Sequence, residues 1–237
     1  MALARFKKVC LDALEPDRLG RFWADVLGLE WRRYPHGEGG VFGAAERPVL
    51  WVNRVPEGKT VKHRVHLDVY AADPTALTEI GARVIRPEGD GGIQWTVLAD
   101  PEGGEFCAFR PPVERAGSVA PAPLARRQRS LVVDSADQAA QAAWWGRVLG
   151  VPADHYNGIS SLREVPRMPF ESLDFVPVPE PKAVKNRIHW DLAVDDPGTL
   201  IEAGAAVLRT PGGDVSWHVL ADPEGNEFCA FPEPEAG

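Results

Sequence analysis

The sequence predicts an α+β fold made of four βαβββ units arranged as two tandem copies. The main observation is an internal repeat, because VLADPEGGEFCAF at 97–109 recurs as VLADPEGNEFCAF at 219–231, with Gly104 replaced by Asn226. Two further segment pairs keep an offset of about 122 residues: HRVHLDV (63–69) with NRIHWDL (186–192), and FWADVLGL (22–29) with WWGRVLGV (144–151). The chain is therefore a tandem duplication.

The first half of the first copy has a strand, a helix and three strands. RFKKVCLDA (5–13) alternates as a strand does, and Pro16-Asp17 then begins a segment with apolar residues at helical spacing, which Gly28 ends. Three strand-like segments follow: LEWRRY, GVFGAA and PVLWVNRV.

The second half of the first copy repeats this order. RVHLDVY is a strand, Asp73-Pro74 begins a short helix, and ARVIR, QWTVLA and EFCAF are strands. Each copy is thus two βαβββ units. We expect domains at 1–112 and 129–237, joined by a linker at 113–128 that is rich in Pro, Ala and Arg and lacks hydrophobic periodicity.

Composition excludes several classes of function. A net charge of −8 gives no basic surface for a nucleic acid. No apolar stretch approaches the roughly 20 residues that span a bilayer, so we expect no membrane partner, and the first residues do not resemble a secretory signal. Three widely spaced cysteines without a CxxC pair fit a reducing compartment, so we expect a cytoplasmic protein.

The motifs resemble those of the vicinal oxygen chelate (VOC) superfamily, which includes glyoxalase I, bleomycin-resistance proteins and extradiol dioxygenases. The most specific are FWADVLGL and WWGRVLGV, the HLDV and HWDL strands, and DPEG before the last strand of each copy. The resemblance implies two glyoxalase-like domains with curved mixed sheets and helices on their convex sides. It leaves function open, because the scaffold hosts enzymes and binders.

The resemblance also implies where a metal would bind. Four strand positions in each copy supply ligands in metal-dependent relatives, and they fall in this chain at Lys8, Trp51, His66 and Cys107 in copy one, and at Ser130, Asp174, His189 and Cys229 in copy two. In many relatives a site joins halves of different copies, which would combine His66, Cys107 and Asp174. If one divalent ion such as Zn, Ni or Fe binds, we expect it to bind in that set rather than in its counterpart around His189.

The remaining candidates concern catalysis and ligand binding. Glu105 and Glu227 lie two residues before the two cysteines, on the same strand face, and are the candidate general bases. The alternative is that they close the DPEG turn. Candidates for lining a ligand pocket lie on the strands of the expected ligand positions or on the strand before DPEG: Lys8, Trp51, Asp68, Trp95, Asp191 and Trp217. The tryptophans among them either stack on a ligand or fill the core.

Two functions remain open. One is a metal-free pocket for a planar or oxygenated organic compound, as in bleomycin-resistance proteins, and the loss of metal ligands at Lys8, Ser130 and Trp51 favours it. The other is a metal-dependent glyoxalase-type lyase or dioxygenase. A monomer that acts as a pseudo-dimer by duplication would suffice for either, and a homodimer is the alternative.

Overall fold

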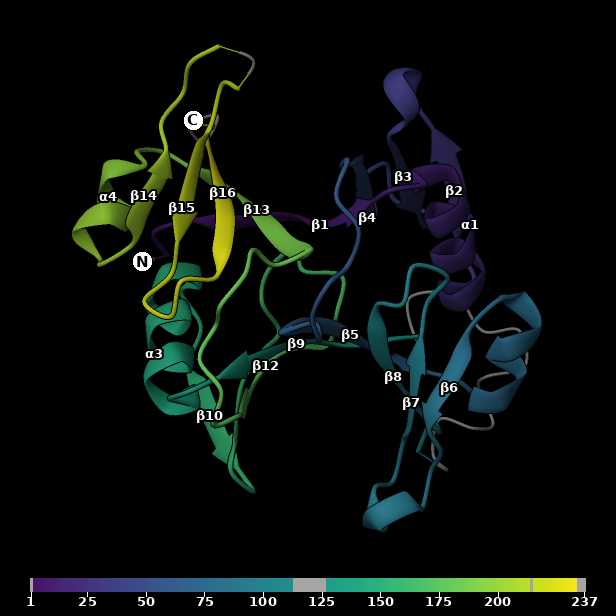
Figure 1. Ribbon diagram of the computed structural model, residues 1–237. Helices are drawn as coiled ribbons and strands as arrows, with labels where there is room; N and C mark the ends of the chain where they lie inside the picture. Colours follow the sequence, from purple (N-terminus) through teal and green to yellow (C-terminus); the bar gives the residue numbers. More distant parts are fainter. Residues whose placement is uncertain (1, 113–126, 214, 234–237) are drawn as a thin grey trace. The chain divides into compact units, whose positions relative to one another are not determined.

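The computed structural model describes residues 2–112, 127–213 and 215–233. Most of the predicted linker 113–128 lies outside these residues. The strand order is β14-β15-β16-β13-β1-β4-β3-β2 in one eight-stranded sheet and β10-β11-β12-β9-β5-β8-β7-β6 in the other. These mixed sheets and few helices confirm the predicted α+β fold (Figure 1).

The chain forms two compact units, which are described separately. Unit 1 contains Met1–Cys10 and Val132–Gly237, and unit 2 contains Leu11–Leu131. The first strand of each copy therefore begins in one unit and ends in the other. The domain boundaries inferred from the repeat, 1–112 and 129–237, stay a prediction.

The first copy contains the elements that the sequence predicts, in the predicted order. Its first half contains β1 (Arg5–Ala13), α1 (Pro16–Leu27), β2 (Glu30–Arg33), the 3-10 turn η1 (Pro35–Gly37), β3 (Gly39–Phe42) and β4 (Pro48–Arg54). Its second half contains β5 (Val65–Tyr70), the 3-10 helix η2 (Pro74–Ile80), β6 (Arg83–Arg86), the turn η3 (Asp90–Gly92), β7 (Thr96–Ala99) and β8 (Glu105–Phe109).

The second copy repeats the order with small local differences. It contains β9 (Gln128–Ser135), α3 (Gln138–Leu149), β10 (Ala153–Tyr156), β11 (Ile159–Arg163), β12 (Ser172–Pro177), β13 (Ile188–Val194), α4 (Gly198–Glu202), β14 (Ala206–Arg209), β15 (His218–Ala221) and β16 (Glu227–Pro232). The short helix of the second half is α-helical here, whereas η2 is a 3-10 helix.

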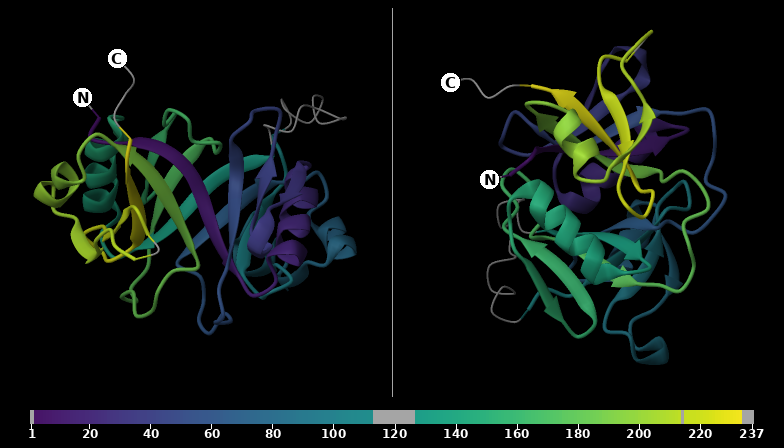
Figure 2. Two further views of the ribbon diagram at one scale, coloured as in Figure 1. Left: turned by 90° about the horizontal axis from the view of Figure 1, so that it is seen from above. Right: turned by 90° about the vertical axis from the view of Figure 1, so that its left-hand side faces the viewer.

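Each long helix packs on strands of its own unit (Figure 2). Helix α1 begins at Pro16, ends at the left-handed Gly28, and buries Phe22 and Trp23. The indole of Trp23 makes an edge contact with Phe106, with ring centroids 5.1 Å apart. In unit 1 Trp145 contacts Phe228 at the same separation. These tryptophans are therefore core residues.

The DPEG turn ties the last strand of each copy to the start of the first helix. Asp100 accepts hydrogen bonds from the N–H groups of Glu102 and Gly104 at 2.9 and 2.8 Å. Glu102 reaches across to accept from the backbone N–H groups of Leu14 and Glu15 at 3.0 and 2.8 Å. The motif is thus structural, because its two carboxylates satisfy backbone donors that have no strand or helix partner.

Candidate functional site

The candidate site of unit 2 lies on one face of β5 and β8. The two strands are parallel, with Asp68 opposite Cys107 and Tyr70 opposite Phe109. Alternation places His66 on the same face as Asp68. Ligand-type atoms of His66, Asp68 and Cys107 all lie within 4.8 Å of one another.

Asp68 is the centre of this cluster and is already held by a cation. His66 Nε2 lies 3.5 Å from Asp68 Oδ1, and the Arg129 guanidinium donates to Oδ2 at 2.6 Å. The Asp68 side chain is only 6% exposed, so this charge-assisted bond is screened little by water. The structure pairs Asp68 with His66 and Arg129, and the ligand-lining role of Asp68 stays a prediction.

An aromatic pair borders the same cluster. Trp95 stacks on Phe109 with ring centroids 5.4 Å apart and planes 27° from parallel. The Arg129 guanidinium carbon lies 3.8 Å from the centre of the Phe109 ring, a cation–π distance. Both rings are half-buried, so part of each stays exposed.

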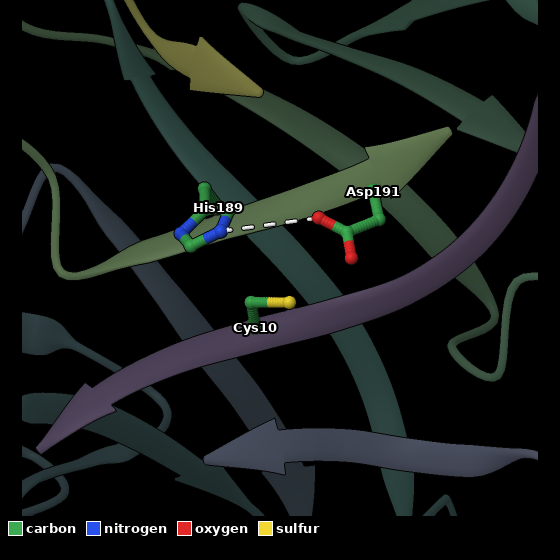
Figure 3. A group of neighbouring side chains, drawn as sticks. All are labelled: Cys10, His189 and Asp191. Carbon is green, nitrogen blue, oxygen red and sulfur yellow. Dashed lines mark ion pairs between the residues drawn. The ribbon is translucent and has the colours of Figure 1, made fainter. Parts of the chain in front are cut away.

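Unit 1 repeats the arrangement with different side chains (Figure 3). His189 Nε2 lies 3.9 Å from Asp191 Oδ1, and Lys8 Nζ lies 3.5 Å from Asp191 Oδ2. Cys10 extends from β1 toward both residues, and the three ligand-type atoms of Cys10, His189 and Asp191 lie within 4.8 Å of one another. Cys229 lies opposite Asp191 in the parallel β13–β16 register.

The aromatic pair also recurs in unit 1. Trp217 stacks on Phe231 with centroids 4.9 Å apart and planes 25° from parallel. Lys7 Nζ lies 4.4 Å from the centre of the Phe231 ring. Both units therefore place a stacked Trp–Phe pair, a cation from the first strand of a copy and a His–Asp pair on one sheet face.

The thiols at these faces are protonated near neutral pH. Burial, followed by the charge of the Asp191 carboxylate, raises the pKa of Cys229 to about 12. Burial, followed by the charge of Asp191, also raises the pKa of Cys10 well above its ordinary value. Burial and Asp68 do the same for Cys107. None of these thiols is an activated nucleophile in this state.

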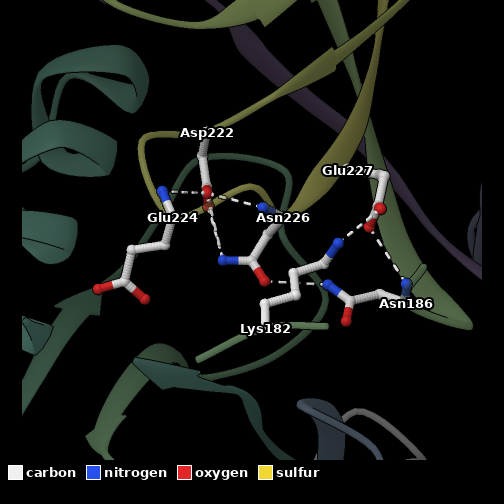
Figure 4. A network of polar contacts seen from close by, with 6 residues as sticks. All are labelled: Lys182, Asn186, Asp222, Glu224, Asn226 and Glu227. Atoms are coloured by element: carbon white, nitrogen blue, oxygen red, sulfur yellow. Dashed lines mark hydrogen bonds and ion pairs between the residues drawn. The ribbon is translucent and has the colours of Figure 1, made fainter. Parts of the chain in front are cut away.

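The two candidate general bases are engaged in ion pairs. Lys59 Nζ lies 2.7 Å from Glu105, and the His63 N–H donates to the same carboxylate at 3.0 Å. Burial alone would raise the pKa of Glu105, but these two donors lower it below its ordinary value. In unit 1 Lys182 and the N–H of Asn186 bind Glu227 in the same way, at 2.6 and 3.1 Å (Figure 4). The lowered pKa makes Glu105 a weak proton acceptor.

Two other predicted residues lie on further strands. Trp51 lies on β4 of unit 2, where its ring is 5.2 Å from that of Tyr34. Asp174 lies on β12 of unit 1, opposite Ser161 in the register of β11. The predicted metal set of Asp174 with His66 and Cys107 takes residues from both units and stays a prediction.

Several site residues escaped the sequence reasoning, among them Cys10 and Arg129. Cys10 follows the expected ligand position Lys8 by two residues, so strand alternation was a usable signal for it. Arg129 directly precedes Ser130, the counterpart of Lys8 in the second copy, so strand alternation did not point to it. On β1 both Lys7 and Lys8 are half-buried between the buried Phe6 and Val9, so alternation breaks at this place in the strand.

The comparisons with known proteins agree with this architecture. A model of the glyoxalase-like domain matches the chain twice, at residues 8–109 and 130–231. No curated protein matches. Glyoxalase I from Zea mays is 16% identical with a TM-score of 0.59, covering 96% of this chain and 92% of its own. A candidate dioxygenase from Bacillus subtilis is 12% identical with a TM-score of 0.61, covering 98% and 86%.

At these identities the solved structures establish the fold alone. No helix among the described residues is long and apolar enough to cross a membrane. The two matches to the domain model cover most of the sequence and coincide with the two copies of the repeat. The chain belongs to the glyoxalase-like domain family and carries two such domains in tandem.

Proposed function

We propose that this protein binds a planar, oxygenated organic compound on the His–Asp face of each unit. The observation that carries the proposal is the recurrence of one arrangement in both units. Each face combines a stacked Trp–Phe pair with a cation within cation–π distance and a His–Asp pair. The arrangement recurs although its cation changes from Arg129 to Lys7.

The chemistry of these groups matches such a ligand. A half-buried Trp–Phe pair offers a flat apolar surface on which an aromatic ring can stack. His66 and Arg129, or their counterparts, can donate hydrogen bonds to hydroxyl or carbonyl oxygens beside that ring. A compound that has both features would use the whole face.

A metal-dependent lyase or dioxygenase is the second candidate. The close approach of His66, Asp68 and Cys107 favours it, because a divalent metal needs several convergent donors. In unit 2, however, the short bond from Arg129 already engages Asp68, and Glu105 is engaged with Lys59. These ion pairs support binding over catalysis on that face.

Calorimetric titration with 2,3-dihydroxynaphthalene tests the proposal. This probe is planar and has vicinal oxygens, and 1,2-cyclohexanediol is the control that keeps the oxygens without the flat ring. We expect saturable binding of the first compound only, with a chelator present. W95A and W217A should each weaken binding at the site of their own unit by about tenfold or more, whereas W95F and W217F, which keep a planar ring, should retain most of it.

Equal binding of both diols, or unchanged binding in both alanine variants, would contradict this function. Oxygen consumption with the naphthalene diol after addition of Fe²⁺, abolished by H66A, would instead favour the dioxygenase.

A further inference from the structure

We propose that Cys10, His189 and Asp191 of unit 1 hold a thiophilic divalent cation, for which Zn²⁺ is the best match. The thiol, imidazole and carboxylate come from two strands, β1 and β13, and face one another (Figure 3). Their ligand-type atoms already lie within 4.8 Å of one another. The inference does not depend on the proposed binding of an organic compound.

The donor types select the metal. One sulfur, one nitrogen and one carboxylate oxygen form a mixed set of the kind that suits Zn²⁺ better than Mg²⁺ or Ca²⁺, which prefer oxygen alone. Three protein ligands leave a fourth tetrahedral position open to water or a ligand. The Cys229 thiol also contacts Asp191, so a second sulfur borders the site.

The cation beside each aspartate distinguishes unit 1 from unit 2. In unit 2 the Arg129 guanidinium lies 2.6 Å from Asp68, a strong bond that a metal would have to displace. In unit 1 Lys8 Nζ lies 3.5 Å from Asp191, on Oδ2, which leaves Oδ1 directed toward His189. A weaker ion pair competes less with a metal ion.

The repeat makes Cys10 the distinctive residue. Its counterpart in the second copy is Val132, which has no ligand atom. The sequence reasoning placed a metal with Asp174 and His66 because it counted ligands at family positions only. The proposal rests instead on a thiol two residues beyond such a position.

Titration of the chelator-treated full chain with Co²⁺, a spectroscopic probe for Zn²⁺ sites, tests this assignment. We expect a thiolate-to-cobalt charge-transfer absorption that saturates at one equivalent and that Zn²⁺ abolishes by displacing Co²⁺. C10V, which copies the residue of the other repeat, should abolish the absorption. C107V is the matched control in unit 2 and should leave it unchanged.

Two further variants test whether folding and the charge of Lys8 affect the result. C10S keeps the side-chain size, so its unfolding midpoint without metal should stay near that of the unaltered chain while Co²⁺ affinity falls by more than about 100-fold. K8M removes the competing charge and should tighten binding. No charge-transfer absorption in the unaltered chain, an absorption that survives C10V and C10S, or one that C107V removes would overturn the proposal.

Discussion

Asp100 shows what burial does to a single carboxylate in this fold. Burial raises its pKa from 3.8 to about 6, although the N–H groups of Gly104 and Glu102 partly offset the effect. Because the folded state binds the proton more tightly, ionisation of Asp100 lowers stability as pH rises through that range. The contribution is favourable below about pH 4 and is lost above about pH 6.

The variant D100N should remove this pH dependence. Asparagine is neutral and keeps an oxygen for the two backbone donors, so its unfolding free energy should change less between pH 4 and pH 6 than that of the unaltered chain. The difference is at most about 3 kcal/mol for a shift of this size. Urea unfolding of both proteins across this range measures it, and parallel stability curves would contradict the assigned pKa.

Asp222 occupies the corresponding place in unit 1 but has more donors. Asn226 Nδ2 donates to its two carboxylate oxygens at 3.2 and 3.0 Å (Figure 4). Trp145 Nε1 also donates to Asp222, at 3.0 Å. Gln141 donates to it as well. Burial still raises the pKa of Asp222, but these hydrogen bonds act against it. Gly104 and Asn226, the residues that differ between the two DPEG repeats, therefore give the buried carboxylate different hydrogen-bond donors.

At the scale of elements, the difference between Gly104 and Asn226 is matched by a second difference, between His63 and Asn186. A Cβ built on Gly104 would lie 2.6 Å from Asp100 Oδ2 and 2.7 Å from His63 Cε1, so the imidazole of His63 occupies the space. In unit 1 the residue matching His63 is Asn186, whose Nδ2 donates to Asn226 at 2.9 Å. The His–Gly and Asn–Asn pairs thus fill the same place beside the last strand.

A double-mutant cycle in unit 2 tests this exchange. G104N alone should destabilise the protein by about 1–3 kcal/mol because the new side chain collides with His63. H63N together with G104N should recover most of that loss, which corresponds to a coupling of about 0.5–3 kcal/mol. Urea unfolding of the four proteins gives the coupling. Strict additivity would show that the two positions are independent.

The elements show how far the sequence specifies the structure. Helix α1 was predictable because Pro16 and Gly28 mark its ends and its apolar spacing is helical. The ion pair of Glu105 was not, because its partner Lys59 lies 46 residues earlier in an irregular segment. Arg129 was missed because the sequence reasoning took the neighbouring Ser130 as the candidate position on this strand.

At the scale of the whole molecule, duplication has preserved one arrangement and varied its charged members. Both units keep a His–Asp pair and a stacked Trp–Phe pair. The cation and the number of thiols differ. The account therefore predicts two faces with shared affinity for a planar ligand, of which only that in unit 1 suits a thiophilic metal.

The most direct test of this account is the stoichiometry of 2,3-dihydroxynaphthalene binding, measured by calorimetry on the unaltered chain, W95A, W217A and the double variant. The account predicts one equivalent for each unit, loss of one site in each single variant and loss of both in the double variant. Each alanine variant should retain the unfolding midpoint of its phenylalanine counterpart to within a few degrees. A single site in the unaltered chain, or stoichiometry that neither tryptophan affects, would contradict it.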